Sequence, residues 1–105
     1  MEQKFFYHRD KERRPIITEC VITDGKHMGI GLAICSPLDS VKKSEGRRHA
    51  EHRALRAIKK KMCSDPINRK EAVNRMGDVS LADPNFRYYP FTNKSVYQEV
   101  TPMHE

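Results

Sequence analysis

The sequence predicts an α+β domain: a small antiparallel sheet of two or three strands, packed by one long basic helix, with a second short helix and an extended C-terminal arm. Three patterns support this fold: an Asp-Gly turn signal between two apolar runs, a later segment with alanines at helical spacing, and a proline-to-glycine segment after it. A chain of 105 residues has room for one modest core. We therefore expect a compact domain over residues 1–77 and an aromatic, proline-containing arm over residues 78–105.

The first expected element is a hairpin with strands at about 15–23 and 26–35. Asp24-Gly25 between apolar runs favours a two-residue turn, and with these turn residues Val21 would pair with Met28. This register gives the sheet two different faces. The face expected to form the core beneath the long helix comprises Ile17, Val21, Met28, Ile30, Leu32 and Ile34, with Glu19 as its one misfit. The other face, expected to be covered by another part of the chain or by a second protein, comprises Ile16, Thr18, Cys20, Ile22, Gly29, Gly31, Ala33 and Cys35.

The remaining elements follow from local patterns. KFFYHRD near the N-terminus is expected to form a further strand. The segment GRRHAEHRALRAIKKKMC (46–63) is expected to be a helix, because its apolar side recurs at three- and four-residue spacing; that side comprises Ala50, Ala54, Ala57, Ile58 and Met62. Asp65-Pro66 and Gly77 are typical helix start and stop signals, so a second helix is expected at about 66–76.

The basic charge is concentrated in one segment. Residues 42–61 contain nine Lys and Arg residues and two Glu residues, a charge of +7, whereas the whole chain has a formal charge of +6. Such a concentration is typical of a surface that binds phosphate. The alternative is an ordinary solvated helix face.

Two groups of side chains in this segment are candidate anion-binding residues. Helical spacing places one row opposite the alanine stripe, where it could contact successive phosphates; the row comprises His49, Arg53, Arg56 and Lys60. The other group surrounds the helix N-terminus, whose free N–H groups favour an anion; it comprises Lys42, Lys43, Arg47 and Arg48. On this geometry neither Arg53 nor Arg56 is needed for the core.

Several classes of protein have no support in the sequence. No apolar run is long enough to span a membrane and the N-terminus lacks a signal peptide, so we expect a cytoplasmic protein. Cys20, Cys35 and Cys63 have no paired spacing, which argues against a disulfide framework or a closed zinc site. No catalytic triad, Walker-type loop or paired carboxylate site is visible. We expect no catalysis, no metal and no cofactor.

The order of hairpin, Gly-Ile-Gly, lysine pair and alanine-rich basic helix resembles, over residues 20–58, the second half of a double-stranded-RNA-binding domain. The last strand of that family leads into a lysine pair at the start of such a helix. The resemblance implies that Lys42 and Lys43 bind phosphate. The chain shows no helix before the hairpin, and its connector is longer than the one in that family.

The long helix carries two further resemblances. His49-Ala50-Glu51 resembles the H-x-E motif of nucleoside deaminases, which supplies a zinc ligand and a proton shuttle. That family also needs P-C-x-x-C downstream, where this chain has only Cys63, so we expect no zinc site and no deaminase activity. The segment CSPLDSVKKSEGRRHAEHRALRA is similar to parts of small uncharacterised accessory proteins encoded by bacteriophages. Such proteins often bind host or defence factors stoichiometrically.

The sequence thus predicts a non-enzymatic protein that binds an anionic partner through a basic helix, with nucleic acid as the leading partner and RNA preferred over DNA. The alternative is a phage-type inhibitor that binds an acidic host or defence protein or sequesters a phosphorylated nucleotide signal. Polyphosphate and carboxylate surfaces need the same cations, so the sequence leaves both open. We also expect a homo-oligomer, formed through the C-terminal arm and the small-residue face of the hairpin.

Overall fold

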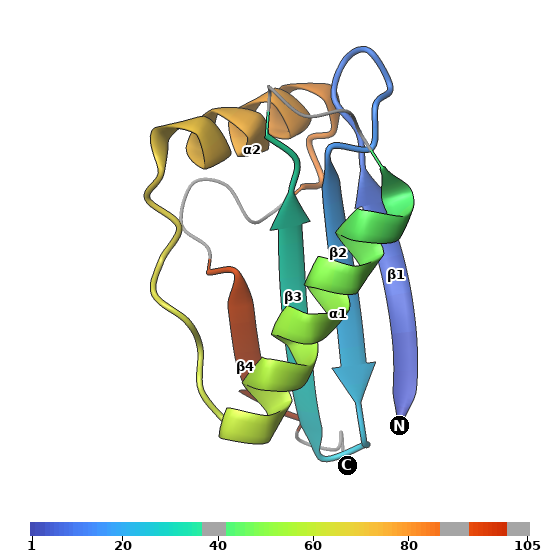
Figure 1. Ribbon diagram of the computed structural model, residues 1–105, viewed down its shortest axis with the longest axis vertical. Helices are drawn as coiled ribbons and strands as arrows, with labels where there is room; N and C mark the ends of the chain where they lie inside the picture. The colour runs from blue at the N-terminus through green and yellow to red at the C-terminus, as the bar shows by residue number, and fades with distance from the viewer. Residues whose placement is uncertain (37–41, 87–92, 101–105) are drawn as a thin grey trace.

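A four-stranded antiparallel sheet forms the centre of the protein, with α1 lying diagonally across one face and α2 at one end (Figure 1). The computed structural model describes residues 1–36, 42–86 and 93–100. Its elements are β1 (Glu2–His8), β2 (Ile17–Thr23), β3 (His27–Ile34), α1 (Lys43–Lys60), α2 (Lys70–Ala82) and β4 (Ser95–Glu99), and the strand order is β1-β2-β3-β4. The predicted α+β class is confirmed. The sheet has four strands and not two or three, because part of the expected C-terminal arm pairs with β3 as β4.

The β2–β3 hairpin forms where it was expected, but its turn lies one residue later. Gly25 is the turn residue with positive φ, at 94°, and the backbone N–H of Asp24 donates to the carbonyl of His27. The carboxylate of Asp24 also accepts from the N–H groups of Lys26 and His27 at 2.8 and 2.7 Å. Gly25 and Lys26 are therefore the loop residues, and the predicted pairing of Val21 with Met28 is wrong. Moving the turn by one residue shifts the pairing of the two strands by two residues, and an even shift leaves the same side chains on each face of the sheet.

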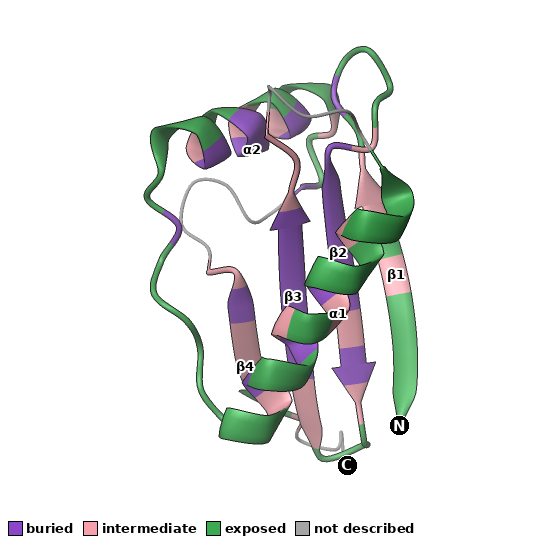
Figure 2. Cartoon of the chain, viewed as in Figure 1, coloured by how far each residue is buried: buried purple, intermediate pink, exposed green. Residues whose placement is uncertain are grey.

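Helix α1 packs on the small-residue face of the hairpin and not on the face of large hydrophobic residues, so the predicted position of the helix is wrong. The physical reason is the close approach of two backbones. A Cβ atom on Gly31 would lie 2.1 Å from the carbonyl oxygen of Ala50, and one on Gly29 would lie 2.2 Å from that of Ala54. Glycines in β3 and alanines in α1 therefore form a narrow seam that holds the helix against the sheet. Most of β3, which α1 crosses, is buried (Figure 2).

The opposite face of the sheet is covered at one end by α2. There the hydrophobic side chains of both elements form a buried cluster, which comprises Ile16, Ile17, Leu32, Ile67, Ala72, Met76, Val79 and Phe86. Glu19, the expected misfit, is 6% exposed and its Oε1 lies 2.9 Å from Nε2 of His8. The buried carboxylate thus has a polar partner on the neighbouring strand.

Helix α2 begins later and ends later than the range 66–76 predicted for it. Pro66 forms an isolated bridge with Asn93, which keeps the chain extended before the helix. The helix then continues through Gly77, because the buried side chains of Met76 and Val79 lie on either side of it. The expected boundary between residues 77 and 78 therefore falls inside α2.

Candidate anion-binding groove

A groove runs between α1 and the segments that lead into α2 and β4. It consists of three adjoining hollows of about 290, 100 and 350 Å³, and Arg53 lines all three. We call it the α1–β4 groove. Its cationic lining residues are Lys42, His49, Arg53, Arg56, Lys60, Arg69 and Lys94, with histidine counted as a potential cation. Its acidic lining residues are Glu45, Asp65 and Glu71.

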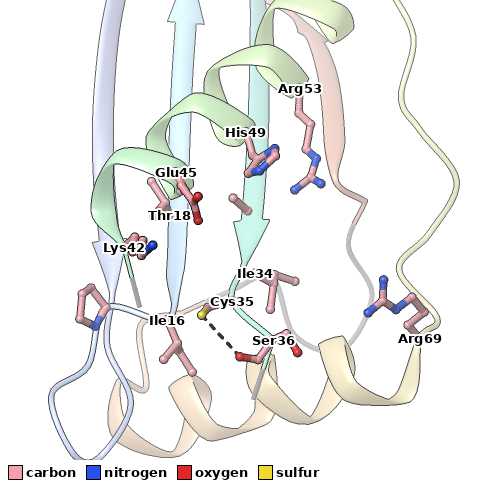
Figure 3. A pocket seen from close by; sticks show the side chains of 13 residues that line it. Ile16, Thr18, Ile34, Cys35, Ser36, Lys42, Glu45, His49, Arg53 and Arg69 are labelled. Atoms are coloured by element: carbon pink, nitrogen blue, oxygen red, sulfur yellow. Dashed lines mark hydrogen bonds between the residues drawn. The ribbon is translucent and has the colours of Figure 1, made fainter. Parts of the chain in front are cut away.

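The predicted row of cations on α1 forms one wall of this groove. It was expected opposite the alanine stripe, and that placement is wrong: the row lies on the flank of the stripe that faces β4. The reason is helical geometry, because each residue turns the helix by about 100° and Arg53 directly precedes the buried Ala54. Figure 3 shows His49 and Arg53 extending from α1 into the hollow, with Arg69 approaching from the other side. Arg56 and Lys60 line the third hollow.

Arg53 occupies the centre of the groove. Its side chain is half-buried, and its Nη1 donates a hydrogen bond of 2.6 Å to the carbonyl oxygen of Leu32. Burial lowers the pKa of Arg53. The expectation that Arg53 has no part in the core is therefore wrong, because it supplies the partner of a buried strand carbonyl.

Two cations that the sequence did not single out complete the centre. Lys94 immediately precedes β4, and its backbone carbonyl accepts from the N–H of Leu32 at 2.8 Å. Arg69 immediately precedes α2 and lines the first two hollows. Burial lowers the pKa of Lys94, and the charges of Arg53 and Arg69 lower it further. Neither residue belongs to the basic segment that forms α1. Arg69 lies 16 positions and Lys94 lies 41 positions after Arg53 in the sequence, and the fold brings both beside α1.

The central cations are poorly compensated by acidic groups. Among the residues that the structure describes, neither Arg53 nor Lys94 forms an ion pair. Arg69 has one carboxylate, Oε2 of Glu71 at 3.7 Å from its Nη2, and both side chains are largely exposed. An exposed pair of this kind contributes little. We refer to Arg53, Arg69 and Lys94 as the central cations.

The four cations expected around the start of α1 do not converge on one site. Lys42 lines the α1–β4 groove. Lys43 and Arg47 instead face β1, with the Lys43 Nζ 4.7 Å from the centre of the Tyr7 ring and the Arg47 Nη1 3.4 Å from the Tyr7 hydroxyl. Arg48 is exposed. The helix start therefore offers cations to two different surfaces.

The His49-Ala50-Glu51 motif is also divided between the two flanks of α1. His49 lines the groove, whereas the carboxylate of Glu51 accepts a hydrogen bond from the Gln3 side chain on β1. Within the described residues, no three His, Cys, Asp or Glu side chains are grouped as a metal site would require.

Comparison of the chain with protein-family models, with curated proteins and with solved structures found no match. No helix in the described part of the chain is long and apolar enough to cross a membrane.

Proposed function

We propose that this protein is a non-enzymatic binding protein that holds the backbone of a single-stranded nucleic acid in the α1–β4 groove, with RNA preferred over DNA. The observation that carries the proposal is the group of central cations. Three positive charges from three separate segments are held close together, two of them without an ion-pair partner among the described residues. Repulsion among these three like charges lowers the stability of the folded protein, and the negative charge of a bound phosphate would offset that loss.

The shape of the groove favours a single strand over a duplex. Arg53 is half-buried and its guanidinium lies against β3, so only a slender anionic chain can reach it. The cationic flank from His49 to Lys60 extends about 16 Å along the helix axis, which is long enough for more than one phosphate. A double helix would contact only the exposed cations of α1.

A phosphorylated nucleotide is the second candidate ligand, in keeping with a phage-type protein that sequesters a nucleotide signal. Its support is the first hollow, whose volume of about 290 Å³ is close to the smallest typical ligand pockets. In this case Arg53 and Arg69, the two central cations that line the first hollow, would bind the phosphates, and the third hollow would stay empty.

Binding of fluorescent oligonucleotides at several salt concentrations tests the proposal. If three phosphates are neutralised in the groove, log affinity for single strands should fall with log salt with a slope of about −2. Single-stranded RNA should bind more tightly than single-stranded DNA, and duplex RNA more weakly than either.

The other outcomes identify the alternatives. Displacement of the oligonucleotide by a mononucleotide at similar molar concentration would favour the nucleotide ligand. Absence of any binding at low salt would contradict the proposal, and capture of a purified acidic host protein under the same conditions would support the inhibitor instead.

A further inference from the structure

Within the part of the chain that the structure describes, strand β1 is an open edge of the sheet. There it pairs with β2 alone, and all seven of its residues are aligned with partners on that strand, from Glu2 with Thr23 to His8 with Ile17. Phe6 in its second half is 45% exposed. The outer edge of a strand of this length presents N–H and C=O groups that can pair with another strand. We propose that β1 pairs with β1 of a second copy of this chain, so that two sheets join into one; this proposal is independent of the groove.

The charges beside β1 are arranged for this partner. Lys43 and Arg47 of α1 lie over Tyr7, near the C-terminal end of the strand. Glu51, one turn further along α1, is joined by a hydrogen bond to Gln3 near the N-terminal end. The surface along β1 is therefore basic at one end and acidic at the other.

Antiparallel pairing of the strand with itself brings opposite charges together. In a two-fold arrangement centred on Phe5, Gln3 of one copy lies opposite Tyr7 of the second copy, and the whole strand is used. Glu51, which is hydrogen-bonded to Gln3, then faces Arg47 of the second copy. The two-fold axis generates a second, equivalent contact between Arg47 of the first copy and Glu51 of the second. Lys4 lies opposite Phe6 of the second copy, so no two like charges are directly opposed.

This arrangement replaces the interface expected from the sequence. The small-residue face of the hairpin is buried under α1 and cannot contact a second chain. The described end of the C-terminal segment is held as β4 at the other edge of the sheet. Pairing through β1 leaves the α1–β4 groove of both copies open, since the groove lies on the other flank of α1.

Charge reversal at the two ends of the surface tests the proposal. Arg47→Glu alone places two carboxylates opposite each other in both symmetric contacts, and Glu51→Lys alone opposes two cations. Each variant should raise the dissociation constant of the dimer roughly tenfold, measured by sedimentation at several concentrations. Mixing the two variants should restore the wild-type value, because both contacts of the heterodimer then join opposite charges.

Amide hydrogen exchange provides a second measurement that does not depend on the charges. Exchange of β1 amides should slow as protein concentration rises through the dissociation constant, while exchange of the loop at Gly25 stays unchanged. A monomer at all concentrations, or a dimer in which the mixture is no tighter than the single variants and β1 exchanges freely, would overturn the proposal.

Discussion

Replacing Gly31 with alanine is expected to destabilise the protein by about 3 kcal/mol, the upper end of the usual cost of overpacking a core. The added Cβ would lie 2.1 Å from the carbonyl oxygen of Ala50 and 2.5 Å from the backbone nitrogen of Ala54. Both atoms belong to the helix backbone and cannot rotate away. Either α1 moves off the sheet or β3 bends, and both weaken the seam. Chemical denaturation of the variant measures the loss.

Gly46→Ala is the matched control, because it adds the same methyl group between α1 and the sheet, here against β2. Its Cβ would lie 2.5 Å from the hydroxyl oxygen of Thr18, the end of a side chain that can change rotamer. Alanine is also favoured over glycine inside a helix by about 1 kcal/mol. This variant should therefore lose less stability than Gly31→Ala, and adding Thr18→Ala should reduce the remaining loss. Equal losses for Gly31→Ala and Gly46→Ala would contradict the backbone contact at Gly31.

The sequence predicted the local elements well because their signals are local. Asp24-Gly25 indicated the hairpin, and the spacing of Ala50, Ala54 and Ala57 indicated α1; both elements are present. Which face the helix covers was predicted wrongly, because large hydrophobic residues usually mark the core. Here the glycines of β3 allow a closer helix than large side chains would, so the small-residue face is covered by α1.

The candidate site was predicted only in part, for a similar reason. The cations of α1 were visible as a local charge pattern, whereas Arg69 and Lys94 reach the groove through the sheet topology. No periodicity in one segment could indicate that β4 returns beside β3. The unusual position of Arg53 depends on the Leu32 carbonyl, a strand acceptor that only the folded chain places beside α1.

Replacing Arg69 and Lys94 together with glutamine is expected to weaken binding of single-stranded RNA about 100-fold. Each charge-assisted contact contributes about 1.5 kcal/mol, and 1.4 kcal/mol corresponds to a factor of ten. The salt slope should become shallower because fewer phosphates are neutralised. The matched control removes two positive charges from the exposed outer side of α1, as Arg48→Gln with Lys59→Gln, and should change affinity only a few-fold.

The same double variant should be more stable than the wild type, which separates loss of the site from loss of the fold. Burial, followed by the charges of Arg53 and Arg69, lowers the pKa of Lys94 below its usual value of 10.5. Below its lowered pKa the charged Lys94 therefore destabilises the folded protein. This penalty is relieved as the pH rises from the lowered pKa to 10.5, where the unfolded chain binds more protons than the folded protein. Lys94→Gln should remove the penalty at neutral pH and flatten the rise in stability with pH, as thermal denaturation at a series of neutral to alkaline pH values would show. If affinity instead falls in the control and persists in the Arg69 and Lys94 variant, the anion binds to the outer face of α1 and the groove is not its site.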